Sequence, residues 1–192
     1  MKLRYKSSTG FTLIEITILL SLFTVVVFAL VVILLGNNNL FGFLRTAVLS
    51  GQGGRLAADR VLMQTREADA VVANRVFSGQ SYNSGENTLI LEMKTVDSAN
   101  EFISGSFDYA VYHLNPTKPN QLIEEVEAAP GSRRASQTRI LTDQVLSLSF
   151  AYDQPNPQNA HEVTLRLVTS AQYKSSSSTI PLMVSAKLRD KN

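Results

Sequence analysis

The chain contains no cysteine, and none of its first 115 residues is a proline. Without cysteine it has no disulfide, no thiolate metal site and no cysteine nucleophile. This absence does not fix the cellular compartment, because many extracytoplasmic domains also lack cysteine. All six prolines lie at position 116 or later, so none can break a helix in the N-terminal part of the chain.

A large excess of charge of either sign is also missing. The 192 residues include 18 Lys and Arg against 16 Asp and Glu, a formal net charge of +2. Lys2, Arg4 and Lys6 lie within the first ten residues, and without them the balance is 15 against 16, a net charge of −1. A nearly neutral chain has no general electrostatic attraction to nucleic acid, so we expect no nucleic-acid partner.

The chain does have a long apolar run near its N-terminus. Residues 16–35 carry no charge and consist mainly of Leu, Val, Ile and Phe. About 20 helical residues at ~1.5 Å each span the ~30 Å hydrocarbon core of a membrane. The run is longer than the ~7–15 apolar residues of a secretory signal, and no small-residue cleavage site follows it. We therefore expect a retained transmembrane helix, with its N-terminus in the cytoplasm because the basic residues precede it.

Glu15 lies at the start of this apolar segment. A carboxylate within hydrocarbon costs a few kcal/mol unless it is paired, and such residues usually have a function. Alternatively, Glu15 lies at the level of the lipid headgroups and stabilises the start of the helix through the helix dipole. The carboxylate by itself leaves both interpretations open.

The six residues from Gly10 to Glu15 read G-F-T-L-I-E, after a short basic leader and before the apolar run. They resemble the class III signal of type IV prepilins and pseudopilins. The resemblance implies that a prepilin peptidase cuts after Gly10 and N-methylates Phe11, and that Glu15 is the assembly residue. A neighbouring subunit's Glu15 would pair with the new amine of Phe11. Because a paired charge is tolerated in an apolar bundle and an unpaired one is costly, this pair would favour one axial register.

Beyond residue 35 the helix pattern changes. Gly36 and the three asparagines after it are weak helix formers and should loosen the helix at the membrane boundary. An apolar face with helical spacing then resumes, formed by Ala58, Val61, Leu62, Thr65, Ala68 and Val72. The glycines at 51, 53 and 54 predict a flexible joint rather than a phosphate loop, since no strand precedes them and no Lys-Ser/Thr follows. The pilin plan implies one helix from Phe11 to about Ala73.

From residue 78 onwards, short alternating segments separated by Gly, Pro, Ser and Asn predict strands. The candidate strands are 88–93, 107–114, 121–126, 145–152, 162–170 and 181–188. Their spacing predicts an antiparallel sheet, and so an α+β fold with a long N-terminal helix packed on a β-sheet head. The expected divisions are a leader (1–10), a transmembrane and assembly helix (11–35), an amphipathic continuation (36–77) and a β-rich head (78–192).

The order of these pieces carries a second resemblance, to the J-class minor pseudopilins of type II secretion and to W-type minor pilins. It rests on segments 55–60 and 66–68 of the helix, 109–114 and 121–123, 141–152, and 184–189 near the end. The end departs from the pattern, with Lys187 and Leu188 before Arg189. The absence of a helix proline, which major pilins often carry, also favours a minor subunit.

No residues in the sequence form a recognisable catalytic, cofactor or metal site. We expect structural roles for His113, in a strand, and His161, in a polar loop. Glu124, Glu125 and Glu127 predict a solvated strand end. The alternative is a cation site that they would share with a loop aspartate such as Asp143 or Asp153. Arg133 and Arg134 predict an exposed loop; the alternative is a contact with phosphate or DNA, which the net charge does not support.

The resemblance therefore implies a minor pilin or pseudopilin, a non-enzymatic subunit of a type IV pilus-like or type II secretion filament. It would lie in the bacterial inner membrane with its head outside. Its partners would be prepilin peptidase, other pilin-like subunits, the inner-membrane assembly platform and membrane lipid. A separate cytoplasmic ATPase would drive assembly. Two alternatives stay open: a ligand-binding minor pilin, either an adhesin or a DNA-uptake protein, and an ordinary single-pass membrane protein with an extracytoplasmic domain.

Overall fold

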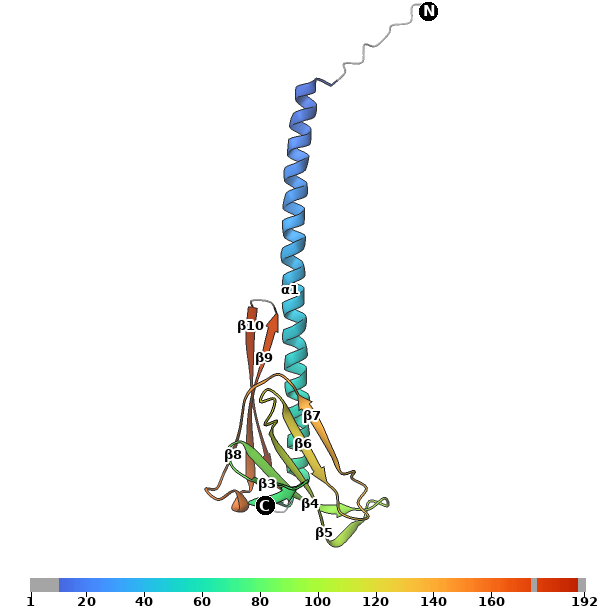
Figure 1. Ribbon diagram of the computed structural model, residues 1–192, viewed down its shortest axis with the longest axis vertical. Helices are drawn as coiled ribbons and strands as arrows, with labels where there is room; N and C mark the ends of the chain where they lie inside the picture. Colours follow the sequence, from blue (N-terminus) through green and yellow to red (C-terminus); the bar gives the residue numbers. More distant parts are fainter. Residues whose placement is uncertain (1–10, 174–175, 190–192) are drawn as a thin grey trace, which may run out of the picture. The chain divides into compact units, whose positions relative to one another are not determined.

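The computed structural model describes residues 11–173 and 176–189. They form one long helix, α1 (Leu13–Glu67), followed by a β-rich region (Figure 1). The chain divides after Leu44 into two compact units. In the second unit the rest of α1 packs on antiparallel sheets, so the predicted α+β architecture is confirmed.

The described part of the first unit is dominated by the apolar portion of α1. The most apolar 18-residue window of the helix has a mean hydropathy of 3.3, and none of that window is buried. Its Leu, Ile, Val and Phe side chains are exposed. A single long apolar helix near the N-terminus fits a single-pass membrane protein.

The prediction that the helix loosens at Gly36 and the following asparagines is wrong. Residues 36–39 are helical, and α1 continues through them without interruption. Gly costs only about 1 kcal/mol relative to Ala in a helix, and helix formation is cooperative. Four weak helix formers between two strongly helical stretches are therefore not enough to break the helix.

The head contains three antiparallel sheets. The first has the strand order β1-β4-β5-β6-β7, the second β10-β9-β8, and the third is the hairpin β2-β3. The elements are β1 (Ala70–Val71), β2 (Asn74–Phe77), β3 (Gln80–Asn83), β4 (Thr88–Val96), β5 (Phe102–Leu114), β6 (Leu122–Glu127), β7 (Gln137–Thr142), β8 (Val145–Tyr152), the short helix η1 (Pro157–Asn159), β9 (Glu162–Tyr173) and β10 (Ser176–Lys187).

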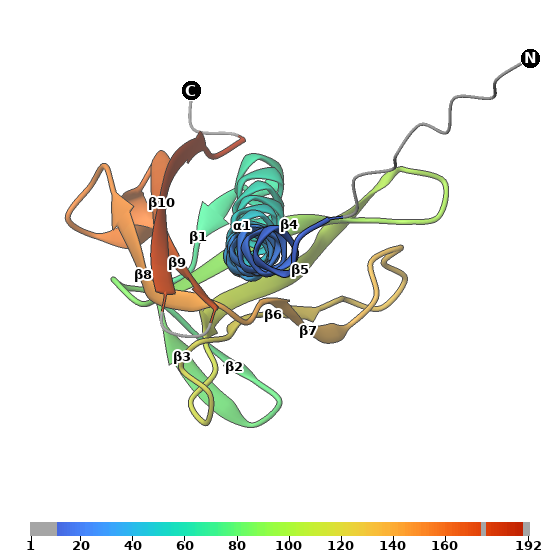
Figure 2. The ribbon, with the colours of Figure 1, turned by 90° about the horizontal axis from the view of Figure 1, so that it is seen from above.

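Within the head, α1 lies between the five-stranded and the three-stranded sheets (Figure 2). The predicted face is confirmed at Ala58, Val61 and Thr65, which are buried. The main core also includes Leu89, Leu91, Met93, Ala110, Tyr112, Leu122, Phe150, Leu165 and Leu167. The helix ends at Glu67, before the expected Ala73, because residues 70–71 pair with β4 as strand β1.

The glycines at 51, 53 and 54 are not a flexible joint, and that prediction is also wrong. All three are helical, and a Cβ added to any of them would meet a side chain of the β-rich head. A Cβ on Gly54 would lie 2.9 Å from Cγ2 of Thr169 and 3.0 Å from Cδ1 of Leu182. Ser50, on the same face, donates to the carbonyl of Ser170 at 3.0 Å. A larger residue is therefore most crowded at Gly54, whereas a Cβ on Gly51 would lie 3.2 Å from Cδ1 of Ile180 and one on Gly53 would lie 3.4 Å from Oγ1 of Thr142.

All six predicted strands are present, most of them longer than expected. Four strands were missed: β1, β2, β3 and β7. The hairpin β2-β3 turns at Ser78 and Gly79, which both have positive φ angles of 48° and 84°. Two adjacent residues of this kind, one of them glycine, are typical of a tight hairpin turn. The expected start of the head at residue 78 falls in the middle of this hairpin.

Candidate functional site

The first turn of α1 carries Glu15, one of the three residues singled out at the N-terminus. Glu15 Oε2 accepts hydrogen bonds from the backbone N of Thr12 (2.9 Å) and from its hydroxyl (3.0 Å). In return, Thr12 Oγ1 accepts from the backbone N of Glu15 (3.4 Å). This reciprocal arrangement is a capping box, which satisfies N–H groups that an open helix end leaves unpaired. The Thr-x-x-Glu spacing could have predicted it from the sequence.

The cap gives Glu15 a local role at the helix start, as one of the two sequence interpretations expected. Both of its bonds end on Oε2, so the cap does not use Oε1. Phe11, next to the cap, is 76% exposed. Gly10 and the rest of the leader lie outside the described residues.

In the head, the acidic residues of β6 do not form one cluster. Side chains alternate along a strand, so Glu124 faces α1 while Glu125 and Glu127 face the opposite side of the sheet. Glu124 is fully buried, which contradicts the predicted solvated strand end. The three carboxylates therefore cannot converge on one cation.

Glu124 lies at the centre of a buried polar network. Arg60 Nε donates to its Oε1 at 2.8 Å, and Arg139 Nε lies 3.0 Å from its Oε2 in a less well-aligned ion pair. The hydroxyl of Tyr112 is 3.0 Å from Oε1 of Glu124 and 2.6 Å from Oε1 of Gln64. Burial, and then the negative charge of Glu124, raise the pKa of Tyr112 well above its ordinary value. The network joins α1 to β5, β6 and β7.

A second buried carboxylate, Asp108 on β5, holds the loop between β6 and β7. Its Oδ2 accepts from Arg134 Nη1 and from the Ser132 hydroxyl, both at 2.8 Å, and its Oδ1 accepts from the backbone N of Ala129 at 2.8 Å. Arg134 Nη2 also donates to Glu67, the last residue of α1, at 2.9 Å. Burial alone would lower the pKa of Arg134, but its hydrogen bonds to Asp108 and Glu67 outweigh burial and raise it.

The prediction that Arg134 lies exposed in a loop is therefore wrong, because its side chain has a structural role. Its side chain is only 18% exposed. Arg133 does match that prediction, since it is exposed and its guanidinium donates to Asn100.

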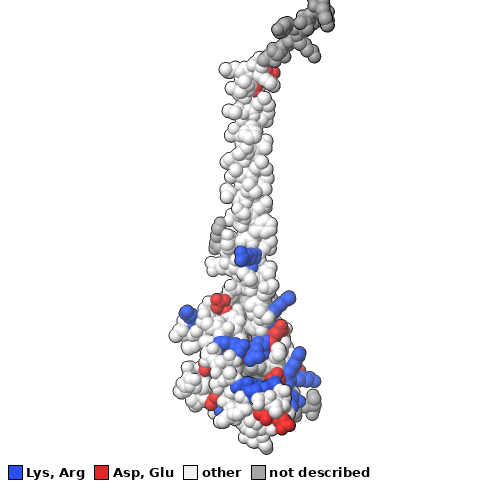
Figure 3. Space-filling view, turned by 90° about the vertical axis from the view of Figure 1, so that its right-hand side faces the viewer, with Lys and Arg blue, Asp and Glu red and all other residues white. Residues whose placement is uncertain are grey.

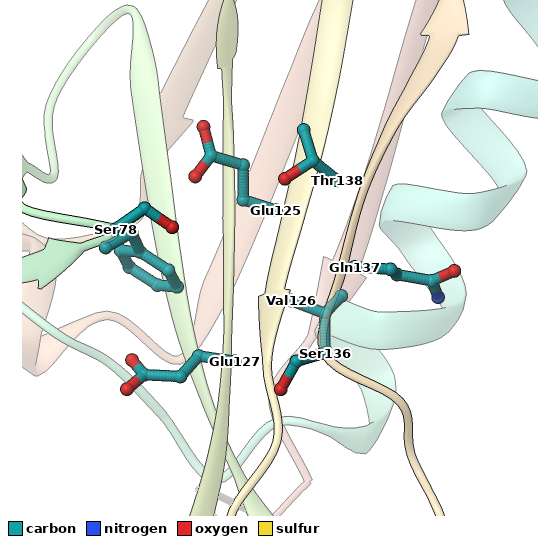
Figure 4. Close-up of a pocket in the computed structure, with 8 residues that line it drawn as sticks. Ser78, Glu125, Val126, Glu127, Ser136, Gln137 and Thr138 are labelled. Carbon is teal, nitrogen blue, oxygen red and sulfur yellow. The ribbon is translucent and has the colours of Figure 1, made fainter.

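The opposite side of β6 faces a cavity of about 330 Å³ beneath the hairpin β2-β3 (Figure 4). Glu125 and Glu127 point to this side, and Val126 between them points to the other. Glu125 Oε1 accepts from the Tyr82 hydroxyl at 3.0 Å, and Glu127 Oε2 accepts from Arg75 Nε at 3.1 Å. Burial, and then the hydrogen bond to Glu125, raise the pKa of Tyr82 to about 12. The two carboxylates fasten the hairpin to the sheet.

Both histidines have the structural positions that the sequence predicts. His113 lies in β5, with Nε2 3.0 Å from Glu125 Oε1 and Nδ1 2.9 Å from the Leu114 carbonyl. His161 lies in the loop before β9 and its backbone N donates to Asp153 at 2.8 Å. Although burial opposes it, backbone hydrogen bonds from Glu162 and His161 lower the pKa of Asp153.

Asp153 thus lies beside the three-stranded sheet, whereas β6 belongs to the five-stranded one. Within residues 11–173 and 176–189, no group of three or more His, Asp or Glu side chains could hold a metal ion.

The chain matches no protein-family model and no curated protein. A function can therefore be inferred only from the residues themselves, mainly those of the N-terminal motif and of the exposed apolar helix. Among the side-chain contacts of these sites, sequence reasoning missed those of Arg60, Arg134 and Thr12.

Proposed function

We propose that this chain is a minor pilin or pseudopilin, a non-enzymatic subunit of a pilus-like or secretion filament. The observation that carries the proposal is the placement of the G-F-T-L-I-E motif at the start of a helix that is first fully exposed and apolar, and then built into a β-sheet head. Such a chain can be held in a membrane by one half of a helix and present a folded domain with the other half.

In this proposal a prepilin peptidase cuts after Gly10, and Phe11 becomes the N-methylated terminus. Before assembly the helix lies in the inner membrane with the head outside, and lipid covers its apolar side chains. On assembly the apolar side chains of sister helices replace lipid. The Oε1 atom of Glu15, which the cap does not use, is available to the Phe11 amine of a neighbouring subunit.

Processing is tested first. The full chain is expressed in bacteria that contain a prepilin peptidase, and the intact mass of the mature protein is measured. We expect a chain that begins at Phe11 and carries one methyl group. The proposal would be contradicted by retention of Met1 or by a cut at another position. Either result would favour an ordinary single-pass membrane protein.

The role of Glu15 is tested with two matched variants. Glu15→Gln keeps an oxygen that can accept the hydrogen bonds of the cap but removes the charge. Thr12→Ala removes the side-chain part of the cap but keeps the charge. If Glu15 pairs with a neighbour's amine, Glu15→Gln is processed normally but fails to enter filaments, while Thr12→Ala enters them. Normal incorporation of Glu15→Gln would show that Glu15 serves the helix start alone.

A further inference from the structure

A cleft of about 290 Å³ opens in the head between α1, the loop after β6 and the first residue of β7. Three arginines line it, Arg60 from α1 and Arg133 and Arg134 from the loop. The one carboxylate in the lining is Glu67. On the side of the head where β7 lies, Lys and Arg side chains gather with a few acidic side chains beside them (Figure 3).

The negative charges that hold two of these arginines are hidden behind them. Glu124 binds Arg60, Asp108 binds Arg134, and both carboxylates have no exposed surface. The side chains of Arg60 and Arg134 are 32% and 18% exposed. The guanidinium groups are thus held rigidly in place and form the wall that a ligand would meet, and Glu67 is engaged by Arg134.

Of these two arginines, Arg60 retains hydrogen-bonding capacity, whereas both Nη atoms of Arg134 are engaged. A guanidinium has five N–H donors, and the hydrogen bond that Arg60 makes to Glu124 uses Nε. Within the described parts of the chain, no bond uses its two Nη atoms. A rigidly held guanidinium with open Nη atoms, such as that of Arg60, fits the two oxygens of a carboxylate or another oxyanion.

The surroundings favour a peptide over a free anion. Gln137, at the start of β7, also lines the cleft, and β7 is an edge strand of the five-stranded sheet. An edge strand offers backbone N–H and C=O groups to an extended segment. The volume is at the small end for ligand sites and suits one or two acidic side chains.

We propose that this cleft binds the carboxylate side chains of an acidic, extended segment of a partner protein, which runs beside β7. Arg133 and Arg60 receive the carboxylates, and Glu67 limits the affinity by its own negative charge. The proposal concerns the head alone and holds whether or not the chain assembles into filaments.

The test uses the full chain in a non-ionic detergent and a fluorescein-labelled hexaglutamate peptide, with binding followed by fluorescence anisotropy. We expect saturable binding that weakens as NaCl is raised, and no binding of a hexaglutamine peptide. Arg133→Gln should weaken binding by about fivefold or more, since it removes a charge-assisted contact. Arg166→Gln, at an exposed position of β9, changes the net charge equally and should leave binding unchanged.

Glu67→Gln supplies a gain that a misfolded variant could not show, because it removes the competing carboxylate and should tighten binding. Absence of hexaglutamate binding would overturn the proposal, as would an equal loss in Arg133→Gln and Arg166→Gln. Inorganic phosphate that displaces the peptide at equal or lower concentration would overturn the assignment of a protein partner.

Discussion

The two halves of α1 belong to one continuous helix but meet different surroundings. From Ile16 to Leu35 every Leu, Ile, Val and Phe side chain is exposed, all round the helix. From Ser50 to Thr65 the buried positions form one narrow face of mostly small residues, and this face packs on the sheets. To be held in a membrane the first half needs only to be apolar, because lipid adapts to any apolar shape. The second half needs particular residues, because a folded sheet does not adapt.

The glycines make the same contrast. A Cβ on Gly36 would meet no atom within 4 Å, whereas one on Gly54 would collide with β9 and β10. The head also contains buried charges, whereas residues 16–35 contain none. We therefore expect the apolar half to tolerate substitutions that the head does not, and four predictions test this difference.

The largest effect is expected when several charged residues are introduced into the apolar half of the helix. Residues 16–35 include 16 Leu, Ile, Val and Phe, each of which favours membrane insertion by about 0.3–0.6 kcal/mol. One lysine costs about 2.5–3.5 kcal/mol, so Val26→Lys should still insert. Lysines at Val26, Leu30 and Ile33 together should prevent insertion, as measured by extraction with alkaline carbonate. Loss of insertion with the single lysine would show that the apolar half is as sensitive as the head.

In the head, we expect a single substitution to cause a large loss of folding stability. Arg134→Met leaves the buried carboxylate of Asp108 without its cation, which should lower the free energy of unfolding by about 3–5 kcal/mol. Chemical denaturation in detergent, followed by near-UV circular dichroism, measures the change. The control Arg166→Met removes an exposed arginine and should have little effect. Equal stability of both variants would mean that the Asp108 network does not hold the head together.

The same substitution at two glycines compares the halves directly. Gly54→Leu should destabilise the head by about 1–3 kcal/mol through overpacking against Thr169 and Leu182. Gly36→Leu should leave the head unchanged and add up to about 1 kcal/mol of helix stability. Thermal unfolding separates the two outcomes. If Gly54→Leu were neutral, the close approach of α1 to β9 and β10 would not require glycine.

The smallest effect concerns alkaline pH and is confined to the head. The pKa of Tyr82 is about 12 in the folded chain and about 10 when unfolded. The unfolded chain therefore loses this proton first, so the stability linked to the neutral phenol is complete below pH 10 and is lost between about pH 10 and 12. The melting temperature should fall across this range, and less steeply in Tyr82→Phe. An equal slope in that variant would exclude Tyr82 as a source of the change.

Much of the fold could be predicted from local patterns. The apolar run, the buried face at Ala58, Val61 and Thr65, and six of the strands follow from hydropathy and periodicity over short windows. The missed strands lack that signal. In β7, for example, Gln137, Thr138, Arg139 and Ile140 are all exposed, so the strand shows no alternation of buried and exposed residues. The hairpin β2-β3 is short, and its turn was taken for a boundary.

The candidate sites divide in the same way. Gly10, Phe11 and Glu15 are recognised from adjacent residues, and the Thr12 cap could have been recognised too. The arginine cleft could not, because Arg60 and Arg133 lie far apart in the chain. Only the packing of α1 beside the loop after β6 brings them together.

The sequence by itself determined that this protein has one apolar helix of membrane-spanning length and a β-rich head after it. These properties are sums over neighbouring residues, so no knowledge of distant contacts is needed. The tertiary structure alone decided which glutamates of β6 are buried, why a glycine stands at 54, and which arginines share a cleft. Those outcomes depend on what lies across the sheet or against the helix, and burial changes the energy of a charge or a methyl group far more than any neighbour in sequence does.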